Sequence, residues 1–124
     1  MRKSELADVR EKADKLIFDA LHNSHMHIEQ YDIDWCFEGE TPEYFEADTI
    51  AEIVDYAKSK ERKIKALFLF FVITDTTPIS ELMEVYYAIK QYCTADCIKR
   101  KFMMATGIMH NTARYRLLLS FSPT

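Results

Sequence analysis

The chain has 124 residues, 48% of them hydrophobic, and a formal net charge of −4 at pH 7. This length and composition predict a single domain over residues 1–124 and exclude a disordered chain. No apolar run approaches the roughly 20 residues of a membrane span, and the N-terminus lacks the apolar stretch of a secretory signal. Three cysteines without the spacing of a disulfide framework favour a reducing, cytoplasmic location.

The first predicted elements lie in the N-terminal third of the chain. Apolar residues recur every three or four positions from Glu5 to about His22, which predicts an amphipathic helix. Alternating apolar and polar residues then predict a half-exposed strand over Ile33–Phe37, with a start as early as Met26. Residues 38–47, which follow, are predicted to form a long acidic loop.

The middle of the chain predicts a helix, a strand and a second helix. Asp48 is expected to cap a helix over Ile50–Ala57. The nearly all-apolar run Ile64–Thr74 predicts a central strand that is covered on both faces. The following helix is expected over Pro78–Tyr92, with Thr77 as its N-cap and proline at the first helical position.

Two more strands, Phe102–Met109 and Tyr115–Phe121, are predicted near the C-terminal end. The four residues between them, 110–113, are too polar and too few for anything but a hairpin turn. The elements therefore alternate between helices and strands until this final pair. We expect an α+β fold, a two-layer sandwich with about three helices on a mixed sheet of about four strands.

The stretch Thr74–Pro78 links a strand to a helix N-terminus, a place where many proteins bind phosphate. Glycine-rich phosphate loops need clustered glycines, but the chain contains only Gly39 and Gly107. We therefore interpret the stretch as a capped helix start and expect no nucleotide and no other cofactor. Anion binding at the backbone amides of Thr76 and Thr77 is the alternative.

Charge is distributed unevenly along the chain. No Lys or Arg occurs over Leu16–Ala57, which holds eleven Asp and Glu, whereas Lys58–Thr124 holds eleven Lys and Arg against five acids. The cations gather in Lys58–Lys65 and in Lys99–Lys101. Solvated helix faces explain such clusters, and the alternative is an electrostatic dipole that favours head-to-tail association. The net negative charge and the lack of an aromatic-rich basic motif argue against nucleic-acid binding.

Three histidines form a candidate metal site. His22, His25 and His27 are close in sequence, and neutral imidazole is a good ligand for zinc or nickel. No second pair of ligands with a recognised spacing accompanies them. A cluster of surface histidines is therefore the favoured interpretation.

Two cysteines form a candidate reactive site. Cys93 and Cys97 are four residues apart and could bind a metal, oxidise or, with His110 as base, supply a nucleophile. No third residue that would orient the base can be named, and no oxyanion loop accompanies the cysteines. Two buried structural thiols are therefore the favoured interpretation.

Several short motifs follow one another in the order of a known family. They comprise Leu-Ala-Asp-Val in the opening helix, an apolar strand that ends in Val-Ile-Thr, Glu-Val in the next helix, an Ala-Asp turn and an Arg-containing final strand. The stretches are Leu6–Val9, Phe71–Thr74, Met83–Val85, Ala95–Asp96 and Arg114–Leu119. Together they resemble the C-terminal domain of FtsZ, the bacterial relative of tubulin, over nearly the whole chain. The chain departs from the family at Asp75-Thr76, where the family has Gly-Gly, and in its longer, acidic loop 38–47.

The resemblance implies a domain that has no GTP site of its own. In the family, GTP is bound by a separate glycine-rich N-terminal domain, and nothing in this chain matches that domain. The family's C-terminal domain presents two acids to the nucleotide of the next subunit in a filament. Glu5 and Asp8 match their positions, although Glu5 replaces an Asp and Lys3 a preceding Asn. The alternative is that both acids only complement a helix N-terminus.

The function that the resemblance implies is assembly or protein interaction, linked to filament or cell-division-type assembly, and not catalysis by this chain. The expected partner is a second copy or an FtsZ-like GTPase domain, rather than nucleic acid or a membrane. The alternative is a small-molecule-binding or catalytic domain with a cleft between the sheet and a helix. Convergent polar groups in a pocket would favour the cleft, and an exposed apolar or single-sign patch would favour an interaction domain.

Overall fold

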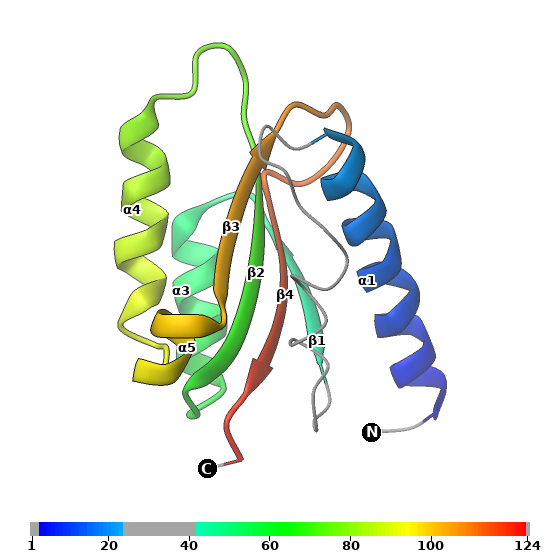
Figure 1. Cartoon of the computed structure of the whole chain (residues 1–124), viewed down its shortest axis with the longest axis vertical. Helices are drawn as coiled ribbons and strands as arrows, with labels where there is room; N and C mark the ends of the chain where they lie inside the picture. Colours follow the sequence, from blue (N-terminus) through cyan, green and yellow to red (C-terminus); the bar gives the residue numbers. More distant parts are fainter. Residues whose placement is uncertain (1–2, 24–41, 124) are drawn as a thin grey trace.

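A computed structural model describes residues 3–23 and 42–123 of the chain. Its elements are α1 (Lys3–Asn23), β1 (Glu43–Ala47), α3 (Ile50–Ser59), β2 (Ile64–Val72), α4 (Ile79–Lys90), α5 (Ala95–Arg100), β3 (Phe102–Gly107) and β4 (Tyr115–Phe121). The four strands form one mixed sheet, and helices lie on both of its faces (Figure 1). The expected α+β class and four-stranded mixed sheet are confirmed, and α1 adds a helical layer on the second face.

The strand order is β1-β4-β2-β3. β2 runs parallel to β3 and antiparallel to β4, and β4 also pairs antiparallel with β1. The predicted hairpin between the last two strands is therefore wrong, because β2 lies between them. The connection after β3 passes the end of β2, where the Ile73 amide donates to the Gly107 carbonyl at 2.9 Å and the Val72 amide to the Arg114 carbonyl at 2.7 Å.

β2 is buried on both faces, as its apolar run predicted. Its side chains alternate between two clusters, one on each side of the sheet. Leu67, Leu69 and Phe71 pack under α3, α4 and α5, together with most of the buried residues of these helices. Ala66, Phe68, Phe70 and Val72 pack under α1, against Ala13, Leu16, Ile17 and Ala20. α1 thus buries two alanines and two larger aliphatic residues against the sheet.

Several predicted boundaries of helices and strands differ from those in the structure. Residues 43–47 of the predicted acidic loop form β1, which pairs along β4. Thr49, and not Asp48, caps α3, because its side chain accepts the Glu52 amide. The predicted cap Thr77 precedes Pro78, after which α4 begins at Ile79, and no side chain caps that helix.

One helix was not predicted from the sequence. It is α5, a six-residue helix capped by Thr94, whose hydroxyl accepts the Cys97 amide at 3.0 Å. The predicted strand Ile33–Phe37, with its start as early as Met26, lies outside the described residues.

Candidate functional site

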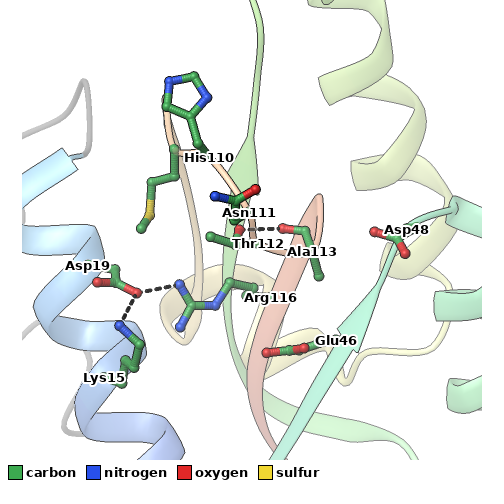
Figure 2. Close-up of a pocket in the computed structure, with 10 residues that line it drawn as sticks. Lys15, Asp19, Glu46, Asp48, His110, Asn111, Thr112, Ala113 and Arg116 are labelled. Atoms are coloured by element: carbon green, nitrogen blue, oxygen red, sulfur yellow. Dashed lines mark hydrogen bonds and ion pairs between the residues drawn. The ribbon is translucent and has the colours of Figure 1, made fainter.

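A polar cavity of about 660 Å³ opens where one end of the sheet meets α1 (Figure 2). Its walls come from α1, the end of β1, the loop between β3 and β4, and the start of β4. The lining residues are Lys15, Asp19, Glu46, Asp48, Met109, His110, Asn111, Thr112, Ala113 and Arg116. Segments that are far apart in the sequence thus place convergent charged groups around one space.

The wall of the cavity contains a buried ion pair. The Arg116 Nη1 lies 2.6 Å from the Asp19 Oδ2, and both side chains are 5% exposed. The Lys15 ammonium reaches the same carboxylate oxygen at 3.5 Å from a position that is mostly exposed. Because the Asp19 and Arg116 side chains are both buried, each charge depends on the other for compensation, whereas the Lys15 ammonium is exposed to water.

Hydrogen bonds extend this ion pair to β1. The Arg116 Nε donates to the Tyr44 hydroxyl at 2.9 Å, and the Tyr44 hydroxyl donates to the Glu46 carboxylate at 2.7 Å. Burial raises the pKa of Tyr44 to about 12, so this hydroxyl keeps its proton at neutral pH. Burial acts to lower the pKa of Arg116, but its hydrogen bonds to Tyr44 and Asp19 outweigh burial and raise it. Around neutral pH the Tyr44 hydroxyl is therefore neutral and the Arg116 guanidinium is charged.

The end of β1 is joined to the start of β4 by Asp48. Its Oδ1 accepts the Arg114 amide at 3.3 Å, although the side chain remains exposed at the cavity. In the loop between β3 and β4, Asn111 adopts a φ of 60°, a conformation that asparagine tolerates better than most residues. This turn brings His110, which is exposed, to the rim of the cavity.

The predicted anion candidates Thr76 and Thr77 are engaged in their own turn. The Thr77 hydroxyl accepts the Thr74 amide at 2.9 Å, and the Thr74 hydroxyl lies 3.1 Å from the hydroxyls of both Thr76 and Thr77. These contacts satisfy the turn itself. Whether an anion also binds there stays a prediction.

The predicted acid pair is only partly described. Asp8 lies on the exposed side of α1 and pairs with Lys12 at 3.3 Å, with more than half of each side chain exposed. The side chain of Glu5 lies outside the described residues. A joint role for Glu5 and Asp8 therefore stays a prediction.

The predicted histidine cluster is also only partly described. His22 is exposed at the end of α1, where its Nδ1 lies 2.8 Å from the Phe18 carbonyl oxygen and its ring stacks on the Phe18 ring at 4.1 Å. His25 and His27 lie outside the described residues. Within 3–23 and 42–123 no three His, Cys, Asp or Glu side chains are grouped to hold a metal ion.

The two predicted cysteines are buried, free thiols in the cluster under α3, α4 and α5. Cys93 donates to the Ile89 carbonyl and Cys97 to the Lys101 carbonyl, both at 3.5 Å. The interaction with the neighbouring Cys97 sulfur and burial raise the pKa of Cys93, which keeps it a thiol. His110 belongs to the cavity on the α1 side of the sheet, so the structure does not bring it to either cysteine.

The two basic clusters meet at one end of the sheet, which we call the basic end. Lys58–Lys65 precede or begin β2, and Lys99–Lys101 precede β3. Because β2 and β3 are parallel, both begin at the lower end in Figure 1, where the Leu67 amide donates to the Lys101 carbonyl at 2.9 Å. A second cavity of about 400 Å³ opens there, lined by Ala57, Lys58, Glu61, Arg62, Lys63 and Tyr92.

The opposite end of the sheet carries exposed acids. Asp48 follows β1, Glu52 lies in the first turn of α3, and Asp75 follows β2. All three side chains are exposed. The described part of the domain thus has a cation-rich end and an opposite end with exposed acids, where Arg114 also lies, paired with Glu81.

An apolar stripe runs along the outer side of α4. Ile79, Met83 and Tyr87 follow one another at intervals of four residues, so they lie on one helix face. They are 83%, 44% and 61% exposed. An apolar stripe of this kind is a common feature of protein-binding helices.

The fold and these surfaces define a small α+β domain with polarised ends. No protein-family model and no curated protein matches the chain. A solved structure described as "FtsZ dimer, empty (M. jannaschii)" is similar to it, with a TM-score of 0.51 and 13% sequence identity. The match covers 90% of this chain and 38% of the FtsZ chain. At this identity the similarity shows a likeness of fold, so the resemblance to FtsZ is confirmed at that level.

Across residues 3–23 and 42–123, no helix is both long and apolar enough to cross a bilayer.

Proposed function

We propose that the chain is an assembly domain that corresponds to the C-terminal domain of FtsZ and acts in filament or cell-division-type assembly. In this proposal it binds a protein, either a second copy or an FtsZ-like GTPase domain. It has no GTP site of its own and catalyses no reaction by itself. The likeness of fold to FtsZ and the motifs from Leu6 to Leu119 support this assignment.

The observation that carries the proposal is the polarised charge of the domain. The basic end gathers cations from two clusters that are far apart in the sequence, and Asp48, Glu52 and Asp75 lie at the other end of the sheet. The basic end of one molecule can therefore attract the acidic end of the next. Such a contact joins two different surfaces, so it need not close and gives chains rather than dimers.

The strength expected of this contact is low. Each exposed ion pair contributes about 0–1 kcal/mol, so several pairs give a weak association that depends on salt. The apolar stripe of Ile79, Met83 and Tyr87 adds apolar surface that a bound partner would remove from water. A partner surface would thus convert a weak contact into a stable assembly.

Sedimentation velocity at high protein concentration, in low and high salt, tests the proposal. We expect reversible oligomers of increasing size in low salt that dissolve as salt rises. The variant K58E/R62E removes two exposed cations of the basic end and should abolish them. R10E/K12E makes the same change of net charge on α1 and should leave them. A monomer at every salt concentration, or a compact dimer that salt does not affect, would contradict head-to-tail association.

A further inference from the structure

The polar cavity beside α1 has the dimensions of a small-molecule site. Its volume of about 660 Å³ falls within the range of roughly 300–1,000 Å³ that is usual for ligand pockets. Its wall includes a guanidinium and a carboxylate that are both 5% exposed, which is unusual for charged side chains. Two sides of the cavity differ in charge, and this difference indicates what could bind.

The side toward α1 offers hydrogen-bond donors. A guanidinium has five N–H groups, and Arg116 uses Nη1 for Asp19 and Nε for Tyr44. Nη2 makes no hydrogen bond with residues 3–23 and 42–123, and Arg116 lines the cavity. The Lys15 ammonium, which pairs with the same Asp19 oxygen as Arg116, adds a second cation (Figure 2). A ligand carboxylate is the natural acceptor for these donors.

The side toward β1 offers acceptors. Glu46 and Asp48 bring two carboxylates to the cavity, and both side chains are exposed to it. Glu46 accepts one bond, from Tyr44, and Asp48 accepts one, from the Arg114 amide. Because a carboxylate has about four acceptor positions, both retain capacity for the donors of a ligand ammonium.

The net charge of the residues that line the cavity also favours some ligands over others. The cavity has two cations, Lys15 and Arg116, and three anions, Asp19, Glu46 and Asp48, so with neutral His110 its net charge is −1. A phosphate dianion would face this net negative charge. A molecule with one positive and one negative group separated by a few atoms would meet an opposite charge on each side.

We propose that the cavity binds a small zwitterion of the free amino acid class. The ligand carboxylate contacts Arg116 Nη2 and the Lys15 ammonium, and the ligand ammonium contacts the carboxylates of Glu46 and Asp48. This inference does not depend on the assembly function, because it concerns one molecule of the chain. It is therefore tested at protein concentrations at which the chain is a monomer.

The experiment is a titration of isotope-labelled protein, followed by the backbone amide signals of residues 109–113. The probes are glycine, serine, leucine and glutamate. For each, an analogue that lacks the amino group and one that lacks the carboxylate serve as matched compounds. We expect at least one amino acid to shift these signals in a saturable manner, and each matched compound to bind at least about tenfold more weakly.

Two variants locate the ligand. Glu46→Gln keeps an acceptor for Tyr44 but removes a negative charge, and Lys15→Met removes the exposed cation. Each should weaken amino acid binding by about tenfold. Glu84→Gln on α4, outside the cavity, is the control and should bind as the unchanged protein does.

Three outcomes would overturn the proposal. The first is that no amino acid shifts the signals of residues 109–113 up to about 10 mM, a concentration that reaches even weak ligands. The second is that Glu46→Gln and Lys15→Met both bind as the unchanged protein does. The third is that inorganic phosphate binds more tightly than every amino acid, which would assign the cavity to anions.

Discussion

Asp19 on α1 and Arg116 on β4 form an ion pair of 2.6 Å between two elements at opposite ends of the chain, with each side chain 5% exposed. This contact is the charged link between α1 and the sheet, whose remaining contacts in the cluster under α1 are apolar. A buried charge without its partner is far less stable than the pair. The free energy of unfolding should therefore depend on this pair.

Removing one member of this pair should destabilise the fold strongly. We expect Asp19→Ala to lower the free energy of unfolding by about 3–5 kcal/mol, because Arg116 stays buried without its counter-ion. Chemical denaturation measures this loss. Asp8→Ala, which breaks an exposed pair with Lys12, is the control and should cost less than about 1 kcal/mol. The double variant D19L/R116M should recover most of the stability, and a loss as large as that of Asp19→Ala would refute the explanation.

The central strand gives a second stability prediction. Phe70 on β2 is 0% exposed and packs under α1, so Phe70→Ala should cost about 3–5 kcal/mol. Ile79→Ala is the control, since Ile79 is 83% exposed on α4 and its truncation should change stability by no more than about 0.5 kcal/mol. Equal losses for both variants in a denaturant melt would contradict the described burial.

Gly107, at the end of β3, lies against the last residue of α1. A β-carbon at this position would lie 2.4 Å from the Asn23 carbonyl oxygen and 2.8 Å from the Phe70 ring. Gly107→Ala must therefore displace the last turn of α1, and we expect a loss of about 1–3 kcal/mol. Thermal unfolding would measure it. An unchanged melting temperature would mean that α1 is not held this close to β3.

Two tyrosines, Tyr44 and Tyr115, should ionise at a higher pH in the folded protein than in the unfolded chain. Burial raises the pKa of Tyr44 from an ordinary value of 10.0 to about 12, and that of Tyr115 likewise to about 12. The folded state thus holds these protons more tightly than the unfolded state. Their stabilising contribution is complete below the unfolded pKa and is lost as pH rises from about 10 through about 12. Tyrosinate absorbance at pH about 11 should be lower in the native protein than in denaturant, and coinciding curves would contradict the burial.

The chain should bind no GTP on its own. It has only two glycines, far apart, and the hydroxyls of Thr76 and Thr77 are engaged with Thr74. We expect no saturable signal when a fluorescent GTP analogue is titrated. If micromolar binding appeared and was displaced by excess unlabelled GTP, the turn before α4 would have to bind phosphate.

The elements with strong patterns could be predicted from the sequence. β2 and β4 are almost wholly buried, and α3 and α4 have apolar positions at helical spacing, so their existence follows from local composition. β1 could not be predicted in the same way, because two of its five residues are glutamates and its neighbour β4 lies far along the chain. α5 has six residues, which is too short for a periodic signal.

The pairing of the strands could not be predicted from local sequence patterns. Sequential strands often pair, which favoured a hairpin at the C-terminal end. β2, however, is covered on both faces and has two edges to satisfy, so β3 takes one edge and β4 the other. No pattern within residues 102–121 carries that information.

The polar cavity was missed although the sequence contains a signal for it. Arg116 is a charged residue inside the apolar run of β4, and Asp19 lies between the buried positions Leu16 and Ala20 of α1. Each is a charge next to apolar positions of a predicted element, and two such charges of opposite sign suggest a buried pair. The basic end could not be located from the sequence either. Its two clusters of cations lie far apart in the chain, and only the parallel pairing of β2 and β3 brings them to one end of the sheet.

The position of β4 between β1 and β2 also affects how the chain can fold as it leaves the ribosome. Among the described strands, β1 pairs with β4 alone, and Glu43 is opposite Leu119. Because a chain is synthesised from its N-terminus, β1 has no neighbour among the described strands until β4 has emerged. Loss of β4 would leave the hydrogen-bonding edges of β1 and β2 that face it without a partner. These strands should therefore assemble only after β4 has been synthesised, and products truncated before β4 should aggregate rather than persist as partly folded domains.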